Sequence, residues 1–201
     1  MSRRQVEVRR EEILRATVDE VSRLGFAQTR VADVAQALGI STGLVFYHFE
    51  SKDALLSAAF AYAAERDLER LDKAAHGTGS AARRLARILR MYGPEDSGAG
   101  WSLWIDAWAT SMRSTEMAEV SQQLDVRWKD TVAAVIAQGV AGGEMTCADP
   151  SGAAWRITAM LDGLAVQSTV HVGVVSRRQV TTWVRAAAAA ELGLDPAALR
   201  P

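Results

Sequence analysis

The sequence predicts an all-α protein: an N-terminal three-helix helix-turn-helix domain, residues 1–52, joined by a long helix to a C-terminal helical domain, residues 53–201. Three observations lead to this fold class. Apolar side chains recur at the period of a helix in the segments between glycine-containing breaks. Residues 31–49 show the pattern of two short helices around a tight turn. The one β-like run, residues 170–175, is better interpreted as a helix end and a loop.

The first predicted helix covers residues 7–24 and ends at Gly25, a glycine in the usual position after a last helical turn. The first ten residues are rich in arginine, which indicates an arm that reaches phosphates or the minor groove, or, for Arg3 and Arg4, a solvated tail. The residues that share its apolar face are Ile13, Leu14, Thr17, Val18, Val21 and Leu24, and the basic ones are Arg3, Arg4, Arg9 and Arg10.

Residues 31–49 contain the most informative pattern of the chain. Gly39 favours the left-handed conformation that ends a helix, and Ser41 is a good N-cap for the helix that follows. Two helices joined by such a turn form a helix-turn-helix, whose second helix enters the DNA major groove. The pattern by itself is equally compatible with an ordinary helical hairpin in a core. Its apolar positions are Val31, Val34, Ala35, Leu38, Ile40, Val45 and Phe49.

Ser51 caps the fourth predicted helix, with Asp53 in its first turn, where a negative charge suits the helix dipole. This helix extends to about Ala75, much further than a three-helix DNA-binding unit requires. Five more helices are expected, over residues 81–91, 101–112, 116–141, 150–172 and 177–192.

The segments on either side of the helix-turn-helix carry a family resemblance. Residues 26–31 before it and residues 50–56 after it, with Gly39, Ser41, Gly43 and the aromatic cluster 46–49, resemble the DNA-binding domain of the tetracycline-repressor (TetR) family. The resemblance covers about residues 8–56 and continues as general helical architecture. Phe46 stands where the family usually has Tyr, so one phosphate-directed hydroxyl is missing.

The second helix of the motif exposes its N-terminal residues to base edges, and few of them can make bidentate contacts with bases. Residues at the two ends of the motif are expected to hold phosphates by charge and backbone donors. The resemblance implies the same roles. The predicted DNA-binding residues are Thr29, Arg30, Ser41, Thr42, Gly43, Leu44, Phe46, Tyr47, His48 and Lys52.

A tryptophan-rich helix dominates the C-terminal part. Any single one of these indoles is better explained as a core residue. Three of them within a narrow arc suit the wall of a cavity better than a close-packed bundle, and such a wall would accept a planar apolar molecule or a cation. In the TetR family the ligand cavity lies among these helices, so the resemblance indicates the same region. The predicted ligand-binding residues are Phe60, Tyr62, Leu85, Ile88, Met91, Trp101, Trp104, Ile105, Trp108, Met112, Trp128 and Val132.

The last two long helices are expected to form the interface of a homodimer. One recognition helix reads too few base pairs, and two-fold symmetry would place a second one about 34 Å away on a near-palindromic operator. Packing within one chain is the alternative for these residues: Trp155, Ala159, Gly163, Val166, Val180, Trp183, Val184 and Ala187.

Composition excludes several other classes of protein. There is no apolar run long enough to span a membrane and no secretory signal, and the single Cys147 fits a reducing cytoplasm. His76 and His171 have no carboxylate or thiol at ligand spacing, and no nucleophile–base or phosphate-loop motif occurs. The sequence therefore predicts no metal, no cofactor and no enzyme.

The leading hypothesis is a cytoplasmic, homodimeric repressor that leaves double-stranded DNA when a small, partly apolar or aromatic ligand binds. The ligand would shift the long fourth helix and change the spacing of the two recognition helices. Two alternatives remain: a DNA-binding activator or partner-responsive regulator without a small-molecule inducer, and an all-helical enzyme.

Overall fold

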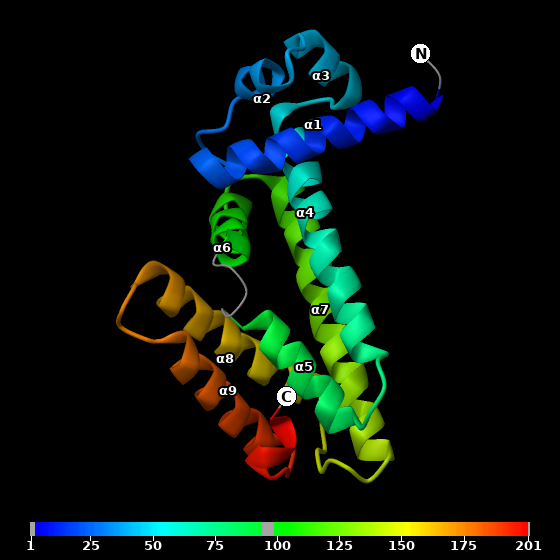
Figure 1. Cartoon of the computed structure of the whole chain (residues 1–201), viewed down its shortest axis with the longest axis vertical. Coiled ribbons are helices and arrows are strands. Elements are labelled where there is room, and N and C mark those ends of the chain that lie inside the picture. The colour runs from blue at the N-terminus through cyan, green and yellow to red at the C-terminus, as the bar shows by residue number, and fades with distance from the viewer. Residues whose placement is uncertain (1–2, 94–98, 201) are drawn as a thin grey trace. The chain divides into compact units, whose positions relative to one another are not determined.

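The computed structural model describes residues 3–93 and 99–200, and in this part of the chain all regular secondary structure is helical, as predicted (Figure 1). Its elements are α1 (Arg3–Leu24), α2 (Val31–Leu38), α3 (Thr42–His48), α4 (Lys52–Ala75), α5 (Ala81–Tyr92), α6 (Ala99–Ser111), α7 (Thr115–Ala141), α8 (Pro150–Val170), α9 (Arg177–Glu191) and the 3-10 helix η1 (Pro196–Leu199).

The chain divides into two compact units, each described here by itself. The N-terminal unit comprises Met1–Arg66 and Ser102–Leu124, and the C-terminal unit comprises Asp67–Trp101 and Asp125–Pro201. Helices α4 and α7 therefore contribute residues to both units. The functional boundary predicted between residues 52 and 53 stays a prediction.

Helix α1 begins at Arg3, four residues before the predicted start, so the basic N-terminal segment is helical rather than an extended arm. Opposite charges at helical spacing support it: an Arg9 nitrogen lies 2.8 Å from a Glu12 oxygen, and an Arg15 nitrogen lies 3.1 Å from a Glu11 oxygen. Each such pair stabilises an exposed helix by about 0.2–0.5 kcal/mol.

The turn between α2 and α3 has the geometry that its residues predict. Gly39 adopts φ 64° and ψ 33°, the left-handed conformation. The Ser41 hydroxyl oxygen accepts a hydrogen bond from the Leu44 N–H at 3.2 Å and so caps α3. Ser51 caps α4 in the same way, accepting from the Ala54 N–H at 2.9 Å. These local bonds define the start of both helices.

The core of the N-terminal unit joins α1, α2 and α3 to the first turns of α4 around Ile13, Val34, Val45 and Leu55, each at most 1% exposed. A second cluster surrounds Phe60. The Phe60 ring packs edge to face with Phe26 (centroids 6.1 Å apart) and with Trp104 (4.9 Å).

Asp106 makes a contact in this unit that the sequence did not predict. Its Oδ2 accepts a hydrogen bond from the Phe26 N–H at 2.6 Å, across 80 residues of chain. The acceptor lies beside Gly25, whose φ of 80° turns the chain out of α1. Helix α6 thus holds the loop that leads into the helix-turn-helix.

The C-terminal unit packs α5, α8, α9 and η1 together, with α8 and α9 side by side (Figure 1). Its buried contacts include Leu85, Leu161, Val184 and Leu199, each at most 2% exposed. Ser176 caps α9, its hydroxyl oxygen accepting from the Gln179 N–H at 3.2 Å. None of the helices in the described residues is both long enough and apolar enough to traverse a bilayer.

Candidate DNA-reading face and ligand site

Helix α3 exposes to solvent the residues that the sequence placed on its outward side. Tyr47 is 69% exposed and Phe46 50%, and Thr42 and Gly43 are also exposed, whereas Val45 is buried. Ser41, Leu44 and His48 lie at the edges of this exposed face, and Ser41 is the N-cap that orients the helix. The exposed face of α3 is therefore small and mostly uncharged.

The residues expected to hold phosphates differ in their placement. Arg30 is exposed, and Lys52 is half-buried in the first turn of α4. Thr29 is only 1% exposed, and its hydroxyl donates a hydrogen bond to the Gly25 carbonyl oxygen at 2.8 Å. The Thr29 hydroxyl therefore holds the loop before α2 and is not directed at solvent.

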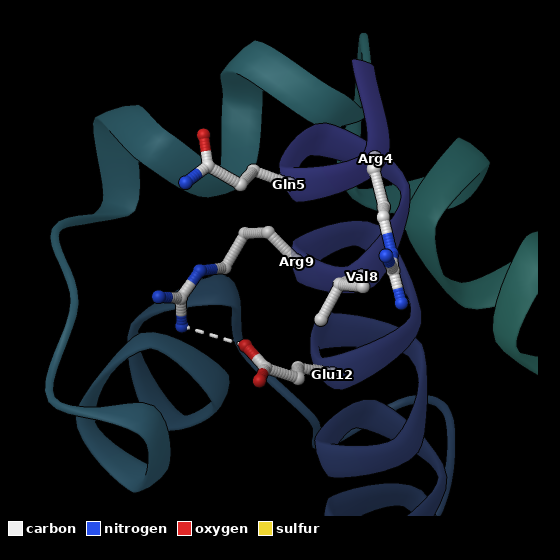
Figure 2. A pocket seen from close by; sticks show the side chains of 5 residues that line it. All are labelled: Arg4, Gln5, Val8, Arg9 and Glu12. Carbon is white, nitrogen blue, oxygen red and sulfur yellow. Dashed lines mark ion pairs between the residues drawn. The ribbon is translucent and has the colours of Figure 1, made fainter. Parts of the chain in front are cut away.

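The N-terminal end of α1 adds positive charge near α3. The Arg10 guanidinium lies 4.9 Å from the centroid of the Phe49 ring, a cation–π arrangement. A surface pocket of about 350 Å³ is lined by Arg4, Gln5, Val8, Arg9 and Glu12. Figure 2 shows the Arg9–Glu12 ion pair within it. The expected basic arm is thus a helical basic edge beside the helix-turn-helix.

His48 ends α3 with its Nε2 buried and without a hydrogen-bond partner among the described residues. Burial lowers the pKa of His48 below its ordinary value, and the positive charges of Arg10 and Arg9 lower it further. The neutral imidazole is therefore favoured in the free protein.

The residues predicted to bind a ligand fall into both units. Phe60, Tyr62, Trp104, Ile105, Trp108 and Met112 belong to the N-terminal unit, whereas Leu85, Ile88, Met91, Trp101, Trp128 and Val132 belong to the C-terminal unit. Phe60, Leu85, Ile88 and Val132 are fully buried core residues. Met112, just beyond the end of α6, is 75% exposed. Trp104 and Trp108 pack together (centroids 5.9 Å), and Trp101 packs against Tyr92 (centroids 5.4 Å).

Three aromatic residues meet inside the C-terminal unit. The Tyr92 ring lies 5.4 Å from Trp101 at 70° and 4.5 Å from Trp128 at 32°. The Trp101 indole N–H donates to the Tyr92 carbonyl oxygen at 3.1 Å. The Trp128 indole N–H is buried and has no acceptor among the described residues. The rings thus form a largely buried aromatic wall with one unused donor.

Charged side chains adjoin this wall. The Tyr92 hydroxyl donates to Asp162 Oδ1 at 2.5 Å, and Lys129 Nζ lies 4.0 Å from Asp162 Oδ2. Lys129 also donates to Asp125. Burial raises the pKa of Asp162, although the Tyr92 hydrogen bond and Lys129 partly offset the effect. Burial, followed by the charge of Asp162, raises the pKa of Tyr92 well above its ordinary value.

Sequence reasoning missed Tyr92, Asp125, Lys129 and Asp162. A usable signal was present at Asp162, a carboxylate within an otherwise apolar stretch of α8, because a charge in such a stretch needs a buried partner. The four residues are named together below as the charged cluster. With Trp101 and Trp128 they combine carboxylates with aromatic rings, the groups by which proteins bind organic cations.

The predicted dimer residues include an exposed set on α8 and α9. Trp155 is 49% exposed and Trp183 42%, and Ala159 and Gly163 are also exposed. Val180 and Val184 are instead buried within the chain, at most 2% exposed. Val166 and Ala187 are intermediate. Some of the predicted dimer residues are therefore exposed on the surface of the chain, and others pack inside it.

Comparison with known proteins adds a family likeness for both parts of the chain. Residues 81–193 match the family described as BetI-type transcriptional repressor, C-terminal, and residues 13–59 match the family described as bacterial regulatory proteins, tetR family. The HTH-type transcriptional regulator BetI of Stenotrophomonas maltophilia (strain R551-3) is 32% identical over 123 residues, which are 60% of this chain and 63% of that relative. The matched region is thus less than two thirds of the relative's length.

Solved structures show the same fold. A transcriptional regulator from Saccharomonospora viridis in complex with choline has a TM-score of 0.83 and 24% identity, and the match covers 92% of this chain and 98% of that one. A TetR-family regulator from Rhodococcus sp. has a TM-score of 0.75 and 27% identity, covering 88% of this chain and 94% of that one.

Proposed function

Because this chain belongs to the TetR family of bacterial transcriptional regulators, with a C-terminal part of BetI type, we propose that it is a homodimeric repressor released from its operator by a small organic cation. The family consists of DNA-binding regulators and is not a class of enzymes. What we propose beyond family membership is that the protein represses transcription, that it forms a homodimer and that its ligand is a small organic cation.

The DNA-reading part of the proposal is supported by the exposed face of α3. Thr42, Gly43 and Tyr47 would meet the major groove, and Arg30 and Lys52 would meet phosphates on either side. Since few of these side chains can distinguish one base from another by hydrogen bonds, part of the sequence specificity would come from DNA shape. Two copies would read a near-palindromic site, with recognition helices about 34 Å apart.

The charge balance of the charged cluster carries the proposal for the ligand. Among the described residues, Asp125 and Asp162 face one ammonium, that of Lys129. Tyr92 is bonded to Asp162 through its hydroxyl, and its ring packs against Trp128. A quaternary ammonium combines one positive charge with an apolar surface, so it suits a carboxylate beside indole and phenol rings. The fold relative bound to choline supports the same class of ligand.

The exposed tryptophans of α8 and α9 support the dimer. Trp155 and Trp183 expose large apolar surfaces, and Gly163 has no atom within 4 Å of the position that a side chain would take. Large aromatic residues beside small ones suit close packing against a second copy of the same face.

Release requires that the ligand bind the DNA-incompetent state more tightly than the competent one. A coupling of ~1–3 kcal/mol, typical of such proteins, raises the operator Kd roughly 5- to 150-fold. Helix α4 is the proposed route, because its residues belong partly to the unit with the helix-turn-helix and partly to the unit with the charged cluster.

The test is selection of bound DNA from random sequence, followed by operator titration with choline and with 3,3-dimethylbutan-1-ol, its uncharged carbon analogue. Choline is expected to weaken operator binding and the alcohol is not. Asp162→Asn should remove the difference, and Asp130→Asn, at an exposed carboxylate of α7, should keep it. If saturating choline leaves operator affinity unaltered, the inducer part of the proposal fails while DNA binding stands.

A further inference from the structure

Lys129 is an unusual residue for the interior of a helical unit. Its side chain is 5% exposed, and its ammonium faces Asp125, Asp162 and the Trp155 ring, whose centroid lies 4.6 Å away. Burying an ammonium is costly unless carboxylates and polarisable groups surround it, and a stretch of α7 that only had to pack would be stabilised as well by an apolar side chain. Its position in the charged cluster indicates a role in the charge of that site.

The two carboxylates share Lys129 unequally. Asp125, one helical turn before Lys129 on α7, accepts its hydrogen bond, whereas Asp162 on α8 is 4.0 Å away. Asp162 is instead bonded to the neutral hydroxyl of Tyr92. Lys129 therefore neutralises Asp125 and leaves the charge of Asp162 only partly compensated.

We propose that Lys129 and Asp125 together determine the ligand charge that the site accepts: Asp125 holds the lysine ammonium away from Asp162, and Asp162 is thereby kept available for one monovalent organic cation. This inference rests on the ligand site proposed above. Neither residue has to touch the ligand, so both act as positioning residues that set its specificity.

The arrangement predicts opposite effects from two neutralising substitutions. Lys129→Met removes a positive charge that repels the ligand, so choline should bind about five- to tenfold more tightly. Asp125→Asn frees Lys129 to pair fully with Asp162, so choline should bind more weakly by a similar factor. The double variant Asp125→Asn/Lys129→Met restores one free carboxylate and should return near the wild-type affinity.

A merely structural role for Lys129 predicts something different, because disrupting the packing of α7 would weaken binding in every variant. The Kd of choline and of 3,3-dimethylbutan-1-ol should be measured by calorimetry at one ionic strength for the full-length protein and for all variants. Asp130→Asn, on an exposed position of the same helix, is the matched control. Circular dichroism establishes that each variant is folded.

The expected result is tighter choline binding by Lys129→Met, weaker binding by Asp125→Asn, recovery in the double variant and a nearly constant Kd for the uncharged alcohol. If Lys129→Met does not fold, the comparison of Asp125→Asn with the double variant decides. The inference is overturned if Lys129→Met and Asp125→Asn change the choline Kd in the same direction, or if the double variant does not recover the wild-type Kd. If Asp162→Asn keeps a preference for choline over the alcohol, the proposed ligand site itself is wrong.

Discussion

The hydrogen bond from the Phe26 N–H to Asp106 predicts a measurable link between α6 and the entrance of the helix-turn-helix. The bond is 2.6 Å long, part-buried and accepted by a carboxylate. Bonds to charged groups contribute about 1.5–3 kcal/mol, and loss of the acceptor leaves a backbone donor unsatisfied. Asp106→Ala is therefore expected to lower the free energy of unfolding by about 2 kcal/mol. Asp106→Asn keeps a neutral acceptor and should cost about 1 kcal/mol.

Urea unfolding followed by circular dichroism measures both values, with Asp130→Ala as a control expected to lie within about 0.5 kcal/mol of wild type. Because the bonded loop leads directly into α2, operator affinity should fall along the same series, whereas choline affinity should not. An Asp106→Ala variant as stable as the control would refute the reasoning. An Asp106→Asn variant as stable as wild type would show that the carboxylate charge contributes nothing.

Four further predictions concern the DNA-reading part. Gly39→Ala should destabilise the protein by about 1–2 kcal/mol, since its φ is 64° and no atom within 4 Å adds a steric cost; an unchanged urea midpoint would contradict this. Gly43→Ala, inside α3, should instead leave stability equal or higher while weakening operator binding, and unimpaired binding would remove Gly43 from the DNA-reading face. Lys52→Ala should make the salt dependence of operator binding shallower by roughly one charge for every DNA sequence, and an unchanged slope would exclude a phosphate contact. His48 has a lowered pKa, so the unfolded chain takes up a proton that the folded protein resists; stability should fall as the pH drops below about 6.5, less so in His48→Gln, and equal pH profiles by thermal unfolding would contradict this.

The helices and the helix-turn-helix could be predicted because their determinants are local. Gly39 and Ser41 act on bonds that span three or four residues, and the apolar period of α2 acts within one helix. The start of α1 was predicted late, at residue 7 instead of Arg3, because its first turns have no apolar face and depend on charge pairs such as Arg9–Glu12. Local patterns also identified the exposed side of α3.

The candidate ligand site could be predicted only in part, because its contacts join distant segments. Helical spacing placed Trp101 and Trp104 on one face of a helix, but spacing alone does not reveal which residues each indole packs against. The tertiary structure supplies their partners: the Trp104 ring packs against Phe60 and the Trp101 ring packs against Tyr92. Thr29 illustrates the same limit of sequence reasoning. Its position in the sequence suggested a phosphate contact, but in the structure it is buried and its hydroxyl donates to the Gly25 carbonyl oxygen.

The amino-acid sequence by itself determined the all-α class, the positions of the helices and the type of DNA-binding motif, because periodicity, caps and turns act over a few residues. Only the tertiary structure decided which charges share a buried space. Asp162 and Tyr92 are 70 residues apart in the chain, and their hydrogen bond exists because α5 and α8 pack in one unit. Burial then makes the balance between Asp125, Asp162 and Lys129 matter, since charges screened at the surface interact strongly once water is excluded.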